Sequence, residues 1–117
     1  MAEIRAVTLI VAEPGVVAGR LASAFGWDVS QDYGSFAEVR AGDGMLLWLN
    51  EPSDSTIDVQ KGVLLHCWVD DVSAATAKAR AAGAVILREP TTMDFGMESA
   101  WAQVEGGPIV DLTRPTS

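Results

Sequence analysis

An internal repeat constrains the fold of this chain more than any other feature. Each half contains a strand, then a helix that ends at a glycine (Gly26 or Gly83), and then further strands. The last strand of each half also matches, because the segment 44–49 aligns with 107–112. A repeat of about 55–60 residues means that one supersecondary unit occurs twice. The sequence therefore predicts an α+β fold of two paired βαβββ modules.

Hydrophobic spacing locates most of these elements. In the first half, Val17, Leu21 and Phe25 recur at helical spacing and predict a helix near 15–25. An Ala-rich run predicts the second helix, near 71–82. Short β-branched or apolar runs predict strands over 5–11, 36–40, 45–50, 63–69, 85–88, 99–104 and 109–112. We expect one domain, 1–117, with module one at about 4–53 and module two at about 61–114.

Composition excludes several classes of function. The 117 residues include 16 acidic and 8 basic ones, for a net charge of −8, which argues against a nucleic-acid partner. The N-terminal residues do not show the pattern of a signal peptide, and we expect none; no apolar run in the sequence is long enough to span a membrane. The single cysteine, Cys67, cannot form a disulfide within the chain. We therefore expect a cytoplasmic protein without membrane or nucleic-acid partners.

Several short motifs follow one another in an order that resembles a known superfamily. They are Phe25-Gly26-Trp27, the segment 66–72, Ala82-Gly83-Ala84, Glu89-Pro90, Phe95-Gly96-Met97 and Gly106-Gly107-Pro108. In this order they resemble the vicinal-oxygen-chelate superfamily, which has the glyoxalase and bleomycin-resistance fold. The resemblance implies that each module curls a mixed sheet into half of a cup-shaped cavity. It also implies that two modules, often from the two chains of a homodimer, close that cavity.

Catalytic members of that superfamily hold a divalent metal on the first and last strands of each module. Carried over one by one, those positions fall on Ala6, Trp48, Leu64 and Asp111. Only Asp111 offers a ligand, whereas a divalent ion needs three or four donors. We therefore predict no metal and no cofactor. His66 lies two residues beyond Leu64, so a two-donor His66–Asp111 site completed by water or a second chain stays open.

Strand alternation selects the residues that would face the cup. We expect Thr8, Leu46, Trp48, Leu64, His66, Trp68 and Asp111 to line it, with Trp101 at a less secure register. The segment 89–97 has no periodicity and is predicted to be a loop that brings Phe95 to the ligand. The indoles would stack on a flat ligand, or they simply fill a core. His66 is a buried residue satisfied by the backbone, a polar anchor for the ligand, or the partner of Asp111.

These residues predict metal-free binding of a small planar aromatic molecule that can be cationic, such as an antibiotic. Resistance by sequestration in a homodimer, as in the metal-free, drug-binding bleomycin-resistance branch that the sequence resembles, is the most concrete form of that function. The alternatives are an enzyme like a glyoxalase or dioxygenase with an unusual metal site, and a carrier protein for a biosynthetic precursor. Cys67 should face the helix layer, where a thiol is more often inert than reactive.

Overall fold

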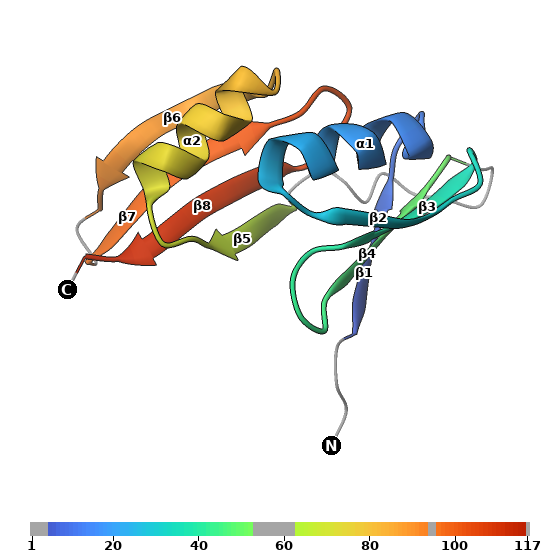
Figure 1. Cartoon of the computed structure of the whole chain (residues 1–117), viewed down its shortest axis with the longest axis horizontal. Coiled ribbons are helices and arrows are strands. Elements are labelled where there is room, and N and C mark those ends of the chain that lie inside the picture. Colours follow the sequence, from blue (N-terminus) through green and yellow to red (C-terminus); the bar gives the residue numbers. More distant parts are fainter. Residues whose placement is uncertain (1–4, 53–62, 94–95, 117) are drawn as a thin grey trace.

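The computed structural model describes residues 5–52, 63–93 and 96–116, which form two helices and eight strands (Figure 1). Module one contains β1 (Ala6–Ile10), α1 (Pro14–Phe25), β2 (Asp28–Asp32), β3 (Phe36–Arg40) and β4 (Leu46–Asn50). Module two contains β5 (Leu64–Trp68), α2 (Val72–Ala81), β6 (Val85–Thr92), β7 (Met97–Gln103) and β8 (Ile109–Pro115).

The two modules have the same sheet topology. Module one forms a four-stranded sheet in the order β1-β4-β3-β2, and module two forms one in the order β5-β8-β7-β6. In both, the first strand pairs in parallel with the last, and the other pairs are antiparallel. This arrangement confirms the prediction of an α+β fold with two βαβββ modules. The sheets are not joined to each other, so β1 and β5 are both edge strands.

Local sequence signals set the ends of both helices. Pro14 begins α1, where its missing N–H costs nothing, and Gly26 ends it with a φ of 74°. Asp71 caps α2, because its carboxylate accepts a hydrogen bond of 3.0 Å from the backbone N–H of Ala74. The observed bounds lie within one residue of those predicted from the sequence.

Two parts of the sheets differ from the sequence prediction. The pattern did not locate β2, because all five of its residues are exposed and no apolar alternation marks it. The predicted loop over 89–97 is wrong at its start, since β6 continues to Thr92. Its pairing with β7 shifts register between Arg88 and Thr91, which lets Pro90 lie in an edge strand that carries a bulge.

The core lies between the sheets and the helices. Both helices cover the same side of the molecule and contact each other (Figure 1). Their small and branched side chains pack on the buried residues of β4 and β8, including Leu49 and Leu112. Alternation turns the intervening residues of each strand to the other side. We call this second side, opposite the helices, the open face of each module.

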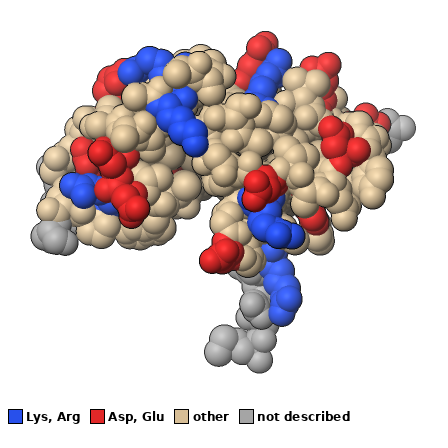
Figure 2. Space-filling view, viewed as in Figure 1, with Lys and Arg blue, Asp and Glu red and all other residues tan. Residues whose placement is uncertain are grey.

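The surface gives two further indications. None of the helices in the described ranges is long and apolar enough to cross a membrane. Acidic and basic side chains are interspersed over the side shown in Figure 2 and do not gather into one patch. Any recognition of charge on that side would therefore depend on individual groups.

Candidate functional site

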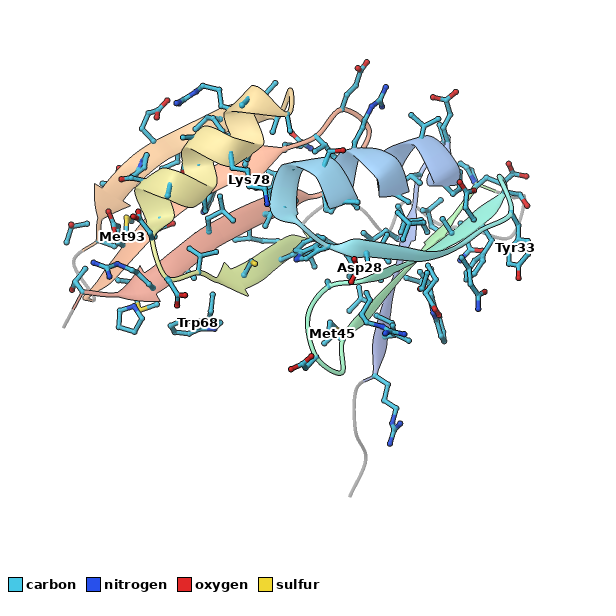
Figure 3. All side chains as sticks on the ribbon, in the orientation of Figure 1. Asp28, Tyr33, Met45, Trp68, Lys78 and Met93 are labelled. Atoms are coloured by element: carbon cyan, nitrogen blue, oxygen red, sulfur yellow. The ribbon has the colours of Figure 1, made fainter. Side chains whose placement is uncertain are left out.

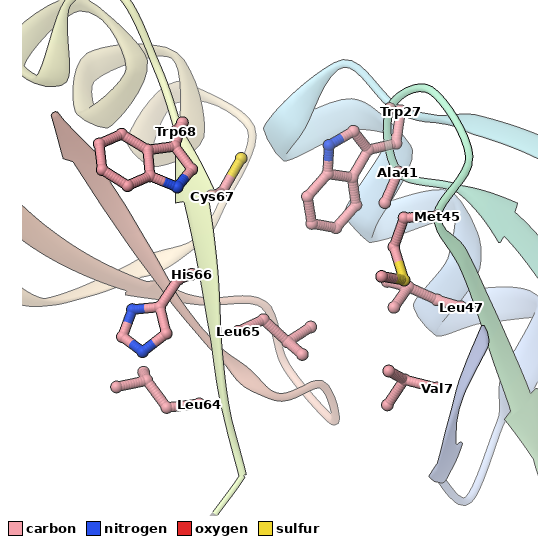
Figure 4. A pocket seen from close by; sticks show the side chains of 11 residues that line it. Val7, Trp27, Ala41, Met45, Leu47, Leu64, Leu65, His66, Cys67 and Trp68 are labelled. Atoms are coloured by element: carbon pink, nitrogen blue, oxygen red, sulfur yellow. The ribbon is translucent and has the colours of Figure 1, made fainter. Parts of the chain in front are cut away.

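The open face of module two brings a histidine and a carboxylate together. In the parallel pairing of β5 with β8, His66 lies opposite Asp111, and the antiparallel pairing with β7 places Trp101 on the other side of Asp111. The register that was insecure for Trp101 is thus settled, and its side chain shares the open face with Asp111. Trp68, two residues beyond His66, lies on β5 (Figure 3) and projects from the same side of that strand as His66 (Figure 4).

Hydrogen bonds fix the orientation of the His66 ring. Its Nδ1 lies 2.8 Å from Oδ2 of Asp111, and the hydroxyl of Ser99 donates to Oδ1 of Asp111 over 2.6 Å. A neutral His66 that donates from Nδ1 presents Nε2 as an acceptor. Asp111 is only 7% exposed, whereas the His66 side chain is 63% exposed. The expectation of a buried histidine is therefore wrong, and the expected His66–Asp111 pair is present.

Arg88 extends this network toward β6. Its guanidinium donates to the Ser99 hydroxyl over 3.2 Å and lies 4.0 Å from the ring centre of Trp101, a cation–π contact. Sequence reasoning missed both Arg88 and Ser99. Ser99 could have been found, because it precedes Trp101 by two residues on one strand. Arg88 could not, since the register shift in β6 decides which side chain faces Trp101.

The open face of module one carries a second network. The indole N–H of Trp48 donates to Glu38 over 2.9 Å, and the Ser30 hydroxyl donates to the other carboxylate oxygen over 2.8 Å. These two hydrogen bonds, that of Ser30 first, lower the pKa of Glu38, and the charge of Arg40 adds to the effect. Trp48 is 38% exposed, so it does not fill the core. Sequence reasoning missed Glu38.

A cavity of about 600 Å³ separates the two modules. Figure 4 shows Leu65 and Cys67 pointing from β5 toward module one, whereas His66 and Trp68 project from the other side of the strand. The cavity is lined from module one by Val7, Trp27, Ala41, Gly42, Met45 and Leu47, and from β5 by residues 64–68. Trp27 also packs on Phe25, with ring centres 5.1 Å apart.

The predicted site residues are divided between these places. Leu64, His66 and Trp68 are among the residues that line the cavity, but their side chains project from the opposite side of β5 (Figure 4), on the open face that they share with Asp111 and Trp101. Leu47 faces the cavity, so its neighbours Leu46 and Trp48 face the opposite side of β4. Thr8 lies beside Trp48. Within one chain, Trp48 and Trp68 thus do not share a cavity. Phe95 lies outside the described residues.

Cys67 lies on the helix side of β5, as its position in the sequence predicted. Burial raises the pKa of its thiol, and the negative charge of Asp111 raises it further. A thiol with a raised pKa holds little thiolate at neutral pH and is a poor nucleophile. The structure gives Cys67 no feature of a catalytic group.

Comparison with known proteins identifies the family. The model of the Glyoxalase/Bleomycin resistance protein/Dioxygenase superfamily matches residues 21–100, which is more than half of the chain. The chain belongs to this superfamily. None of the curated proteins is significantly similar to the sequence.

Solved structures of the glyoxalase fold agree in shape. A protein from Agrobacterium tumefaciens is similar at a TM-score of 0.82 and 20% identity, covering 100% of both chains. TioX from Micromonospora sp. ML1 is similar at 0.76 and 20% identity, over 97% of this chain and 99% of its own. A glyoxalase-related enzyme from Fulvimarina pelagi gives 0.82 at 15% identity, over 97% and 88% of the two chains. At such low identities these likenesses show the fold alone.

The donors present here do not fit the metal that catalytic members of the superfamily hold. Across the described ranges, no three His, Cys, Asp or Glu side chains are grouped as a metal site requires. The register pairs His66, and not Leu64, with Asp111. Both carboxylate oxygens of Asp111 already accept hydrogen bonds. These two donors leave a divalent ion short of ligands.

Proposed function

We propose that the protein binds a small planar aromatic molecule that can carry a positive charge, and that it does so without a metal. Sequestration of such a molecule in the cytoplasm, for example of an antibiotic, would give resistance. The observation that carries this proposal is the pair of exposed indoles, Trp48 and Trp68, one on each module. Each indole has a fixed polar group next to it, namely Glu38 beside Trp48 and His66 beside Trp68.

Trp68 supports binding more directly than any other residue. It is 65% exposed, although burying an indole is strongly favourable. A flat ligand stacked on it would remove that apolar surface from water. His66 would then accept a hydrogen bond from the ligand at Nε2, because Asp111 holds the Nδ1 side of the ring. Such a site orients a ligand and performs no chemical step.

We also propose a homodimer. Trp48 and Trp68 lie on faces that do not meet within one chain, so a cup lined by both requires a second copy. The free edges of β1 and β5 offer backbone groups through which module one of one protomer can adjoin module two of its partner. Light scattering at micromolar concentration should give twice the chain mass of 12.4 kDa, and a mass of 12.4 kDa would contradict the dimer.

A titration against a panel of planar heteroaromatic compounds tests the binding. Ligands should quench tryptophan fluorescence of the wild type. Trp48→Ala or Trp68→Ala should weaken binding by about 1–2 kcal/mol, or roughly five- to thirtyfold, through loss of a stacking face. Val16→Ala is the control, because Val16 is an exposed apolar residue of α1, on the helix side, and does not line the cavity. The proposal is wrong if no compound binds, or if both alanine variants bind as tightly as the wild type.

The His66–Asp111 pair favours a second candidate function. A histidine whose ring is held by a buried carboxylate also suits a general base, which needs a fixed tautomer and access to the substrate. If the protein is an enzyme that transfers a proton, His66→Gln should abolish turnover and keep ligand binding. If it only sequesters its ligand, the same compounds should be recovered unchanged after prolonged incubation.

A further inference from the structure

We infer that Glu38, on the open face of module one, is the group that selects a positively charged ligand. The site is formed by Glu38 with the rings of Trp48 and Phe36, and it would take the ammonium or amidine-like group of an aromatic cation. This inference rests on the proposed function and names the residue that determines its specificity.

Asp111 cannot contact a cationic ligand directly. It is buried, and its two oxygens accept hydrogen bonds from Ser99 and from the Nδ1 side of His66. A ligand would have to displace one of these partners from a nearly closed site, and a buried donor left without its partner is costly. Asp111 therefore acts as a positioning residue for His66.

Glu38 is accessible and has acceptor capacity to spare. A carboxylate has about four lone-pair sites, and the hydrogen bonds from Ser30 and Trp48 occupy one on each oxygen. Within the described part of the chain, no basic side chain forms an ion pair with Glu38. Arg40 lies two residues along β3 on the same face, and its charge favours the ionised form of Glu38. The carboxylate is thus ionised, fixed in direction and partly open to solvent.

Aromatic residues lie next to this carboxylate on the open face. Trp48 lies directly opposite Glu38 in the pairing of β3 with β4, and Phe36 lies two residues before Glu38 on the same face. The ring of Tyr33 stacks on Phe36 with centres 6.4 Å apart. A planar cation held by Glu38 through an ionic hydrogen bond would stack its ring system on the exposed indole of Trp48. Neutral aromatic molecules would gain only the stacking.

Two probes of one shape and different charge test the inference. Proflavine is a planar cation at neutral pH, and acridine is its neutral counterpart. Calorimetric titration of the wild type should give tighter binding of proflavine. Glu38→Gln, which keeps an acceptor for Trp48, should weaken proflavine binding by about five- to tenfold and leave acridine binding unchanged. Added salt should reduce the preference of the wild type for proflavine.

Glu13→Gln is the matched control. It removes the same charge from an exposed residue at the start of α1, on the helix side of the sheet, and should leave both probes unaffected. Equal losses for both probes in Glu38→Gln would mean that Glu38 only positions Trp48, and would overturn the inference. Unchanged binding of both probes would overturn it too and leave the proposed function standing. If neither probe binds the wild type, the inference is wrong, and the proposed function is wrong as well if the whole panel of planar heteroaromatic compounds also fails to bind.

Discussion

The two modules place an indole and a carboxylate side by side on their open faces, but in opposite order. In module one the carboxylate, Glu38, is on β3 and the indole, Trp48, is on β4. In module two the indole, Trp101, is on β7 and the carboxylate, Asp111, is on β8. The backbone accepts either order because these positions face away from the helices. The two modules therefore share a fold but differ in side-chain chemistry at positions that do not contribute to the core.

The interchange changes what each carboxylate can do. Asp111 lies between two neighbouring strands, under His66 and against Ser99, and is buried. Glu38 lies one strand further from the module's first strand and stays partly exposed. A buried carboxylate serves mainly to hold its neighbours, whereas an accessible one can hold a ligand. Position in the sheet therefore decides which of the two carboxylates is accessible to a ligand.

The largest expected effect on stability concerns the hydrophobic core, which is built in the same way in both modules. Leu49 and Leu112 are equivalent core residues on β4 and β8, and both are buried. Changing either one to Ala should lower the free energy of unfolding by about 2–5 kcal/mol, because it leaves a cavity under a helix. Urea unfolding followed by circular dichroism measures this effect.

The matched surface controls are Val29→Ala in module one and Val85→Ala in module two, both at exposed positions. Each should change the free energy of unfolding by less than about 0.5 kcal/mol. A large loss for Leu112→Ala with almost none for Leu49→Ala would mean that the modules do not unfold as one unit. The cores of the two modules would then differ, although the modules share one strand topology.

A smaller effect on stability should distinguish Asp111 from Glu38. Asp111→Asn places an amide N–H₂ against a neighbouring donor in a buried site, and should destabilise the protein by about 1–3 kcal/mol. Glu38→Gln, at an accessible site, should leave the urea midpoint unchanged. Equal shifts of the midpoint in the two variants would break the contrast between a buried and an accessible carboxylate.

The smallest expected effect concerns β5, the strand that pairs with β8 beside Asp111. Module two has Cys67 on the helix side of β5, and its pKa is raised, so the thiolate is scarce at neutral pH. Ellman's reagent should label the folded protein slowly, and the rate should rise about tenfold per pH unit up to that raised pKa. Asp111→Asn should lower the pKa of Cys67 and speed labelling modestly, since burial is the larger cause. Labelling as fast as in denatured protein would contradict the raised pKa.

The sequence predicted most of the fold, but only part of the two hydrogen-bond networks on the open faces. Both helices and the repeat were predicted because helical spacing, caps and glycine stops are local signals. The pairing of His66 with Asp111 was among the interpretations left open, because alternation places both on one face. Glu38, Arg88 and Ser99 were missed. Their roles depend on which strands pair and in what register, and no local pattern in β3 or β6 reports that.

The sequence by itself determined that this chain forms two βαβββ modules and lacks the ligands that its superfamily uses for a metal. Local periodicity decides the first point, and the second is what the resemblance to the superfamily implies, since it puts Ala6, Trp48 and Leu64 at ligand positions. Only the tertiary structure decided that Trp48 and Trp68 face different directions, and that Asp111 is buried while Glu38 is accessible. Burial and direction depend on strand order and on the packing of whole modules, which bring together residues far apart in the chain.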